Sequence, residues 1–516
     1  MFNKKIFFSV VIVLFISITY FFYTNLTLTN PDNPQNESSF NKALKNIIPQ
    51  NIKEFIKDTI FVFKKIDLLE LRLEEQKKYY RNKINELNER ITFQKKSTQD
   101  LVKLLDAEEK FIFTSQEARI KSFGDNKVSI KKYTLPLLTN TGPRAYLNYY
   151  NKNLFLITGS GILMYSSISN LKEDNLEFKR IDTNFDKFIK LGPISEHIKT
   201  LVKNILIKDN KIYLSYVKDN KGNYDSYLDS NKFQFNSDDC YMNSILVADL
   251  NFSKIEFTEF FSTNACKPIY DNHAGGNLYE YKSNYILMTT GDFNSYEKPE
   301  IYNPNEDING EWPQNKESLV GKIISINETN KEYKILSMGH RNPQGLYYDK
   351  INDIIFSTEH GPQGGDEVNI NFSPEKELKN FGWAISSYGD HYGFPDKDNR
   401  DKYEIAPLYK SHSDYGFIEP AKYFKPSIGI TQITKTEEFI KLKNKHVLYV
   451  GSMGWDLDEQ DLSLHQLIYN DDFVLEEHNV MAIEERIRDI IYIKEINQIL
   501  LFLETSGSIA VLNSVN

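Results

Sequence analysis

The sequence lacks an excess of positive charge, and its formal net charge at pH 7 is −9. A surface that binds a phosphate backbone needs clustered lysine and arginine, so nucleic acid is not expected as a partner. Cysteine is scarce, because Cys240 and Cys266 are the only two in 516 residues. Aromatic residues are abundant at 13% of the chain, which is usual for a protein built from many strands.

An apolar run near the N-terminus follows Lys4 and Lys5 and extends from Ile6 to Tyr23. At about 1.5 Å per residue, such a helix nearly spans the hydrocarbon core of a bilayer. The two lysines would keep its N-terminal end in the cytoplasm. A removed signal peptide is the alternative, but the run lacks a small-x-small cleavage site. We therefore predict a transmembrane signal anchor over 1–24, with the rest of the chain exported.

Two further segments precede the main domain. Residues 25–45 are rich in Asn, Pro, Ser and Thr, which is typical of a linker. Over 46–112 glycine is absent and apolar residues recur at steps of three, four or seven, as on one side of a helix. These apolar positions are Ile66, Leu69, Leu73, Tyr80, Ile84, Leu87 and Ile91. We predict a helical stalk, either a coiled coil that makes a homo-oligomer or a helix folded back on its own chain.

Export gives the cysteine pair a meaning. In an oxidising compartment Cys240 and Cys266 are predicted to form a disulfide. Two buried free thiols are the alternative.

From residue 113 to the end, short apolar runs of β type replace the helical pattern. Six of them share a shape, an apolar run followed by a turn and often by a second run: Leu154–Thr158, Ile212–Tyr216, Tyr285–Thr289, Ile354–Ser357, Val447–Val450 and Ile499–Leu503. The second runs are Gly161–Tyr165, Ser244–Leu250, Gly321–Ile326, Glu367–Ile370, Leu464–Tyr469 and Ser508–Leu512. Six similar units without intervening helices predict an all-β six-bladed propeller over 113–516. A pair of β-sandwiches explains the repetition less well.

Polar residues cluster between 339 and 390, in loops at the ends of β runs. Arg341, Asn342 and Gln344 supply a planar cation and two amides, which suit a flat anionic ligand. The turn at 361–365 frees backbone carbonyls, and Asp366 and Glu367 follow it. Hard oxygen ligands of this kind favour Ca²⁺. An ordinary hairpin turn is the alternative for each cluster.

Two more groups of residues point to chemistry. One strand out and one back from His273 brings Asp292 beside it, the arrangement of a general base and the carboxylate that orients it. A turn histidine with an unrelated hairpin aspartate is the alternative. Near the C-terminus Arg486 and Arg488 alternate with apolar residues, so they share one face of a strand and can bind carboxylates. A solvated strand face also explains that pattern.

Taken in order, the motifs resemble the glucose/sorbosone dehydrogenase family, which includes soluble dehydrogenases that use pyrroloquinoline quinone (PQQ). The motifs are His-x-Gly-Gly at 273–276, Thr-x-Gly-Asp at 289–292, Gly-His-Arg-Asn-Pro-Gln-Gly-Leu at 339–346, Glu-His-Gly-Pro-Gln-Gly-Gly-Asp-Glu at 359–367, Asn-Phe-Gly-Trp at 380–383 and Arg-Ile-Arg-Asp at 486–489. The resemblance extends from roughly residue 130 to the end and leaves out the anchor and the stalk.

The resemblance implies a propeller with PQQ in its loop face and a role for each motif. His273 is implied to take the proton from the C1 hydroxyl of a sugar, with Asp292 orienting it. Arg341, Asn342 and Gln344 are implied to touch cofactor and substrate, and Arg341 to stabilise charge on the quinone. The other implied ligands are Arg486 and Arg488 for the cofactor, the carbonyls of Gly361 and Pro362 for one Ca²⁺, and Glu367 with the carbonyl of Phe381 for a second.

Two positions depart from the family pattern. Asn277 stands where the family has arginine, and residues 451–454 contain no lysine to face the quinone. We predict a PQQ- and Ca²⁺-dependent aldose dehydrogenase, anchored in the inner membrane with its propeller in the periplasm and passing electrons to a respiratory acceptor. A non-catalytic propeller that binds a protein or glycan, and a Ca²⁺-dependent propeller hydrolase acting on a lactone, are the alternatives.

Overall fold

The computed structural model describes residues 77–78, 109–135, 144–188, 201–219, 241–263, 265, 273–293, 312–391 and 407–515. The predicted anchor over 1–24, the linker over 25–45 and both cysteines of the predicted disulfide, Cys240 and Cys266, lie outside these residues. Of the segment predicted as helical over 46–112, Lys77 and Lys78 are helical, but strand β1 already begins at Lys110. Within the described ranges no helix is long and apolar enough to cross a membrane.

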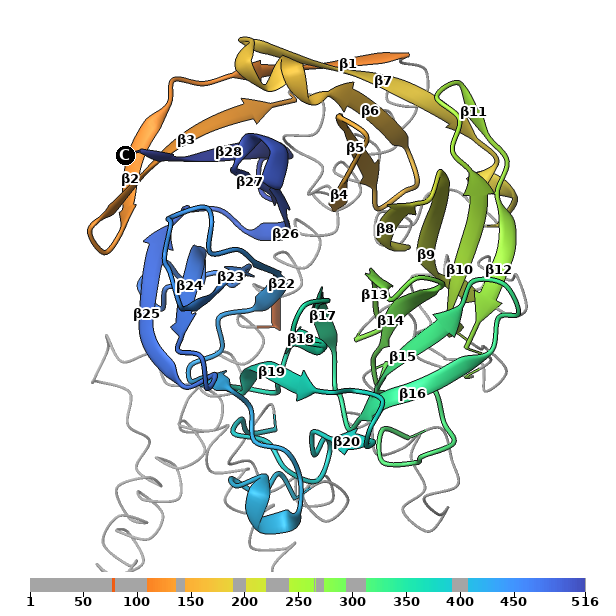
Figure 1. Cartoon of the computed structure of the whole chain (residues 1–516), viewed down its shortest axis with the longest axis vertical. Helices are drawn as coiled ribbons and strands as arrows, with labels where there is room; N and C mark the ends of the chain where they lie inside the picture. Colours follow the sequence, from red (N-terminus) through yellow and green to blue (C-terminus); the bar gives the residue numbers. More distant parts are fainter. Residues whose placement is uncertain are drawn as a thin grey trace, which may run out of the picture. The chain divides into compact units, whose positions relative to one another are not determined.

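The described strands form six four-stranded antiparallel blades, which are arranged in a ring (Figure 1). Blades 1 to 3 are β4(Ala145–Tyr150)–β5(Asn153–Thr158)–β6(Leu163–Ser167)–β7(Asn175–Thr183), β8(Val202–Lys208)–β9(Lys211–Asp219)–β10(Tyr241–Asp249)–β12(Thr258–Ser262) and β13(Gly275–Tyr281)–β14(Tyr285–Thr290)–β15(Lys322–Asn327)–β16(Tyr333–Met338). Blades 4 to 6 are β17(Pro343–Asp349)–β18(Ile354–Glu359)–β19(Asp366–Phe372)–β21(Lys422–Phe424), β22(Ile430–Lys435)–β23(His446–Ser452)–β24(Ser463–Tyr469)–β25(Leu475–Ala482) and β26(Ile487–Ile493)–β27(Gln498–Leu503)–β28(Ser508–Val515)–β3(Asn126–Thr134). The first strand of each blade contacts the first strand of the next, and β26 contacts β4. The predicted all-β, six-bladed propeller is therefore confirmed for the described residues.

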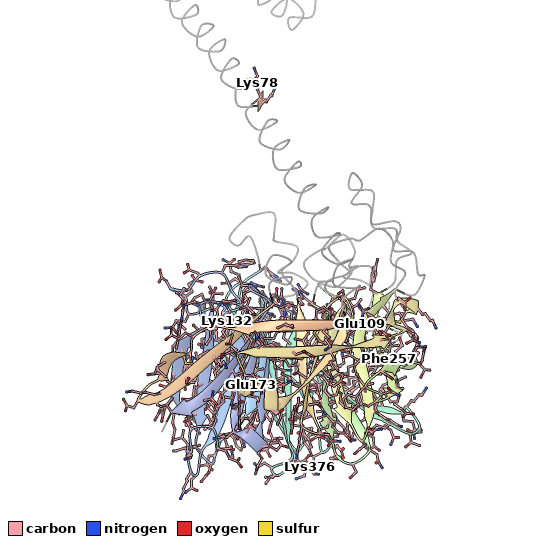
Figure 2. All side chains as sticks on the ribbon, turned by 90° about the horizontal axis from the view of Figure 1, so that it is seen from above. Lys78, Glu109, Lys132, Glu173, Phe257 and Lys376 are labelled. Carbon is pink, nitrogen blue, oxygen red and sulfur yellow. The ribbon has the colours of Figure 1, made fainter. Side chains whose placement is uncertain are left out.

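The ring is closed by strands from both ends of the domain. Blade 6 takes three strands from the C-terminus, and its outer strand β3 comes from the N-terminal side, paired from Ser508↔Thr134 to Val515↔Lys127. Strand β1(Lys110–Ser115) then pairs with both β3 and β7, so blades 6 and 1 are parts of one continuous sheet. Figure 2 shows β1 and β7 lying side by side across the rim. Strand β2(Arg119–Phe123) pairs with β3, β11(Lys254–Ile255) with β7 and β20(Lys379–Asn380) with β16.

The apolar core lies between neighbouring blades. All six apolar runs from the sequence are second strands of blades, namely β5, β9, β14, β18, β23 and β27, and their partners are the third strands. Residues Leu154 to Thr158 of β5 are buried throughout, as is every residue of β18. Residues of these strands pack against the adjacent blade, as Phe155 of blade 1 does with Ile212 and Tyr216 of blade 2 in one cluster. A strand covered on both faces must be apolar on both, which is why these strands were recognisable.

Polar side chains of the inner strands join blade to blade. Four such hydrogen bonds link neighbouring inner strands, with donor and acceptor 2.6 to 3.2 Å apart. They join Asn148 to Ile205, Asn277 to Gln344, Gln432 to Leu346, and Asp489 to Leu147. In each, a side chain of one strand pairs with a backbone group of the next, so the polar side chains of the inner ring link neighbouring blades.

Candidate active site

The predicted site residues lie on loops and at the starts of strands, and the propeller brings many of them to one face. Because the first and second strands of a blade are antiparallel, the start of the first lies beside the end of the second. Residues before or at the start of β13, β17 and β26 therefore share a face with residues that follow β14 and β18. The first set contains His273, Arg341, Asn342, Gln344, Arg486 and Arg488, and the second contains Asp292, Gly361 and Pro362.

The imidazole of His273 pairs with the carboxylate of Asp292. Nδ1 of His273 lies 3.2 Å from Oδ1 of Asp292. The carboxylate is buried, and the histidine side chain is 18% exposed. Because a carboxylate accepts, Nδ1 carries the proton and Nε2 remains as the basic nitrogen. The structure thus brings the predicted base and its orienting acid together, with the base partly open to solvent.

Close backbone contacts hold the two loops in place. The backbone N–H of Gly291 donates to the carbonyl of Ala274 over 2.9 Å, and that of Phe293 donates to the carbonyl of His273 over 3.1 Å. A Cβ at position 291 would lie 1.7 Å from the carbonyl oxygen of His273, so only glycine fits there. His273 itself has φ 53°, a left-handed conformation that costs free energy in a residue with a side chain.

Arg341 is a buried cation that reaches the next loop. Its guanidinium Nη1 donates to the carbonyl of Gly361 over 2.6 Å and to that of His360 over 3.2 Å. The guanidinium carbon lies 5.3 Å from the ring centroid of Trp383, within the range of a cation–π contact. The side chain is 2% exposed, so its charge acts in a low-dielectric surrounding.

The two predicted amides act as a bridge beside this arginine. Oδ1 of Asn342 accepts from Nε2 of Gln344 over 2.8 Å and from the backbone N–H of Gly275 over 3.3 Å. Asn277 donates through Nδ2 to the backbone carbonyl of Gln344 over 2.8 Å. Asn277, where the family pattern has arginine, thus joins blade 3 to blade 4 under the site.

The C-terminal arginines share one acidic partner. Nε of Arg488 donates to Oε2 of Glu504 over 2.5 Å, and Nη2 of Arg486 lies 3.7 Å from Oε1. Burial alone would raise the pKa of Glu504, but the charges of Arg488, Arg144 and Arg486 outweigh it and hold that pKa below its usual value. The predicted shared face of Arg486 and Arg488 is therefore present, with Glu504 between them.

His360 shows that these groups lie near one another. Burial lowers the pKa of His360 well below its usual value. Four groups that can carry positive charge act on the same imidazole and lower its pKa further: Arg341, His273, Arg488 and Arg486. These groups come from blades 3, 4 and 6, so the loop face gathers cationic groups around a histidine that is mostly buried and held neutral.

The loop at 361–366 has the carbonyls predicted for the first Ca²⁺. The carbonyl of Gly361 accepts from Arg341, and that of Pro362 accepts from Oγ of Ser427 over 3.3 Å. Each oxygen keeps a second lone pair. Asp366 is not open to a metal in this arrangement, because its carboxylate accepts from three backbone N–H groups, those of Gly361, Ile428 and Ile430. Burial raises its pKa to about 6, and its role is to hold the loop.

The second predicted Ca²⁺ site falls beside a buried acid–histidine cluster. Oε1 of Glu367 lies 3.4 Å from Nε2 of His412, and burial raises the pKa of Glu367. Phe381 stacks on His340 with ring centroids 5.0 Å apart. In the part of the chain that the structure describes, no group of three or more acidic, histidine or cysteine side chains is placed to hold a metal ion. A calcium ion there would need carbonyl oxygens for most of its ligands.

Sequence reasoning gave no role to two residues that the structure places at the centre of the site. Trp383 was visible only as the end of the Asn-Phe-Gly-Trp motif, yet its indole N–H donates to Oδ2 of Asp292 over 2.7 Å. Glu504 had no local signal, because its two arginine partners lie on the neighbouring strand.

The geometry defines what the face can do. It offers a basic nitrogen on His273, a carboxylate behind it, and arginines able to bind an anionic planar ligand. A hydroxyl proton can be removed at Nε2 while negative charge that develops beside Arg341 is stabilised.

Comparison with known proteins places this arrangement in a family. The model of the family described as Glucose / Sorbosone dehydrogenase matches residues 203–510, which contain every predicted site residue. The match begins at blade 2 and ends in β28.

Among curated proteins, the chain is 27% identical over 236 residues to "Aldose sugar dehydrogenase YliI" of Escherichia coli K12, covering 42% of this chain and 54% of that protein. It is 26% identical over 147 residues to "Quinoprotein glucose dehydrogenase B" of Acinetobacter calcoaceticus, covering 25% of this chain and 29% of that protein. The chain thus spans about half or less of the length of these curated relatives.

Among solved structures, the soluble aldose sugar dehydrogenase of Escherichia coli in its apo-form matches with a TM-score of 0.52 at 18% identity. The match covers 75% of this chain and 100% of that one. A crystal structure of a glucose dehydrogenase matches with the same TM-score and identity over 72% of this chain and 96% of that one. At this level of identity the likeness supports the fold alone.

Proposed function

The chain belongs to the glucose/sorbosone dehydrogenase family, and from that premise we propose that it oxidises an aldose at its C1 hydroxyl with PQQ and Ca²⁺. The single observation that carries the proposal is the His273–Asp292 pair, 3.2 Å apart, on the same face as Arg341. A dehydrogenase of this kind needs a base at the hydroxyl and a cation at the acceptor, and both are present.

The residues of the loop face fit the quinone. PQQ is planar and carries three carboxylates, and the charges of Arg341, Arg486 and Arg488, from two blades, all lower the pKa of His360. Among the described residues, Glu504 forms an ion pair with each of the two C-terminal arginines. Arginines present forked donors that match carboxylates. Trp455, which is 85% exposed and 4.3 Å from the guanidinium carbon of Arg486, adds an aromatic face at the rim.

Calcium fits at the carbonyls of Gly361 and Pro362. These are neutral oxygens, so an ion held there would take its remaining ligands from the anionic cofactor and water. Each carbonyl oxygen would bind the ion through its second lone pair. At Gly361 the other lone pair accepts the hydrogen bond from Arg341. Binding of calcium and of the anionic quinone is therefore expected to be mutually dependent.

The chain's own residues would act as follows. Nε2 of His273 takes the proton of the C1 hydroxyl, and Asp292 stabilises the imidazolium that forms. Arg341 stabilises negative charge at the acceptor, which when bound would take up the hydride. The side chains of Asn342 and Gln344 hydrogen-bond each other, and we expect them to contact cofactor and substrate between the base and the arginine.

We extend the proposal to the cell. The apolar run at 6–23 after Lys4 and Lys5 supports a single-pass anchor in the inner membrane, with the propeller in the periplasm and electrons passed to a respiratory acceptor. The apolar positions between residues 66 and 91 support a stalk through which copies of the chain associate.

The test uses the full-length chain purified in detergent, supplied with PQQ and Ca²⁺. We expect an artificial electron acceptor to be reduced when aldoses are added, and the reduction to stop when a chelator removes the calcium. A chain that binds the quinone, as its absorbance would report, but turns over none of a panel of aldoses contradicts the proposal and favours a binding propeller.

A further inference from the structure

Both oxygens of the Asp292 carboxylate have a side-chain partner. Oδ1 faces Nδ1 of His273 at 3.2 Å, and Oδ2 accepts from the indole N–H of Trp383 at 2.7 Å. The carboxylate is 1% exposed, so the indole N–H supplies the hydrogen bond that water would donate to an exposed carboxylate. The shorter of the two contacts is the one to the indole.

The indole itself is fixed in place. The backbone N–H of Trp383 donates to the carbonyl of Gly339 over 3.0 Å, and its carbonyl accepts from Nε2 of Gln314 over 2.6 Å. The side chain is 3% exposed and packs with Ala384 and Leu408. A donor anchored at its backbone and enclosed by apolar neighbours has one orientation, so it can set the orientation of its acceptor.

The same ring also contacts the cation of the site. The guanidinium carbon of Arg341 lies 5.3 Å from the ring centroid of Trp383. One rigid side chain therefore touches the carboxylate behind the base with its edge and the arginine with its face. It fixes the spacing between the two halves of the site, which come from different loops.

We propose that Trp383 is a positioning residue for the proton-accepting pair, acting through Asp292, and this inference rests on the dehydrogenase function proposed above. With Oδ2 fixed by the indole, the carboxyl group does not rotate, and Oδ1 stays directed at Nδ1 of His273. This keeps the proton on Nδ1 and leaves Nε2 basic, as the reaction requires.

The test is Trp383→Phe in the full-length chain loaded with PQQ and Ca²⁺. Phenylalanine keeps an aromatic face for Arg341 but lacks the N–H. We expect kcat to fall roughly ten- to a hundredfold, as the loss of a hydrogen bond to a buried charge predicts, while KM for the aldose and the affinity for the quinone stay close to wild type. Trp312→Phe is the matched control, because Trp312 packs against the same cluster and should leave kcat unchanged.

A double-mutant cycle separates positioning from a general structural role. If Trp383 acts through Asp292, adding Trp383→Phe to Asp292→Asn should lower kcat little further, whereas a structural role would give multiplied losses. Multiplied losses, or a wild-type kcat in Trp383→Phe, overturn the inference.

A readout without turnover distinguishes this inference from the proposed function. The chain has three tryptophans, so three indole N–H signals are expected in a nitrogen-15 NMR spectrum of the unloaded protein. Asp292→Asn should shift the signal that Trp383→Phe removes. If that signal shifts while the wild type oxidises no aldose, the contact stands and the proposed function fails. If the wild type is active and the signal does not shift, the inference fails alone.

Discussion

The backbone N–H of Asp292 donates a hydrogen bond to the backbone carbonyl of Arg341 over 2.8 Å. This bond joins the loop that follows β14 in blade 3 to the loop that precedes β17 in blade 4. Because the side chain of Asp292 points back to His273, the base and the arginine are held by one residue through its side chain and its backbone. The predicted base and the predicted charge-stabilising arginine therefore lie on one face of the ring.

The first prediction concerns the base. His273→Gln keeps a side chain of similar length but removes the basic nitrogen, so turnover with aldoses should fall on the order of a hundred- to ten-thousandfold. Quinone binding, followed by absorbance, should change little because the arginines remain. His446→Gln, in blade 5 and outside the site, is the control and should keep full activity. Activity retained in His273→Gln would mean that another group takes the proton.

The second prediction concerns the cationic cluster. Arg486→Gln removes one of the charges that act on His360 and should weaken quinone binding about tenfold or more, with a weaker dependence on salt. Titration of the quinone at two ionic strengths measures both effects. Arg119→Gln, on the exposed strand β2, should leave the affinity unchanged. Equal affinities in Arg486→Gln and wild type would place the anionic ligand elsewhere.

The third prediction concerns the bond between blades 3 and 4. Asn277→Ala leaves the part-buried carbonyl of Gln344 without its donor from Nδ2, so the free energy of unfolding should fall by about 1 kcal/mol. Urea unfolding followed by fluorescence measures it. Asn153→Ala removes a comparable bond in an exposed turn and should cost much less. If the two variants lose the same stability, Asn277 is not a link of the inner ring.

The strands that the sequence revealed are those with two apolar neighbours. The second and third strands of every blade were found because their side chains are buried on both faces, as in β18 and β24. The inner strands were not found. Strands such as β22, with sequence ITQITK, carry polar groups that bond the next blade, so no apolar run marks them. Outer strands such as β25 are largely exposed, so no apolar run marks them in the sequence either.

The candidate site was predictable where its residues lie in one loop or in the two loops at the same end of one β-hairpin. His273 with Asp292, and Arg341 with its two amides, follow from short motifs, and the structure brings them together. Contacts between distant loops were not predictable, because no periodicity relates Trp383 to a carboxylate 91 residues away. The sequence also leaves the role of Asp366 open, because an acidic residue after a glycine-rich turn can bind a cation or accept from backbone N–H groups, and the structure shows the second.

The last prediction concerns the dependence of stability on pH. Burial raises the pKa of Asp489 to about 6, although it accepts from the backbone N–H of Leu147 over 2.6 Å. Since the pKa is higher in the folded than in the unfolded chain, the folded state binds the proton more tightly, and this contribution to stability is complete below about pH 4 and is lost as the pH rises through about 6.

The side chain in Asp489→Asn cannot ionise. Its free energy of unfolding should therefore fall less between pH 5 and pH 8 than that of the wild type. The variant should be less stable overall, because one backbone N–H loses its acceptor. Unfolding measured in urea at both pH values tests the difference in slope. Asp174→Asn, whose side chain is 95% exposed, should keep the wild-type dependence. If Asp489→Asn keeps it as well, the carboxylate between blades 6 and 1 is already ionised at pH 5, and the bond to Leu147 must then be strong enough to outweigh its burial.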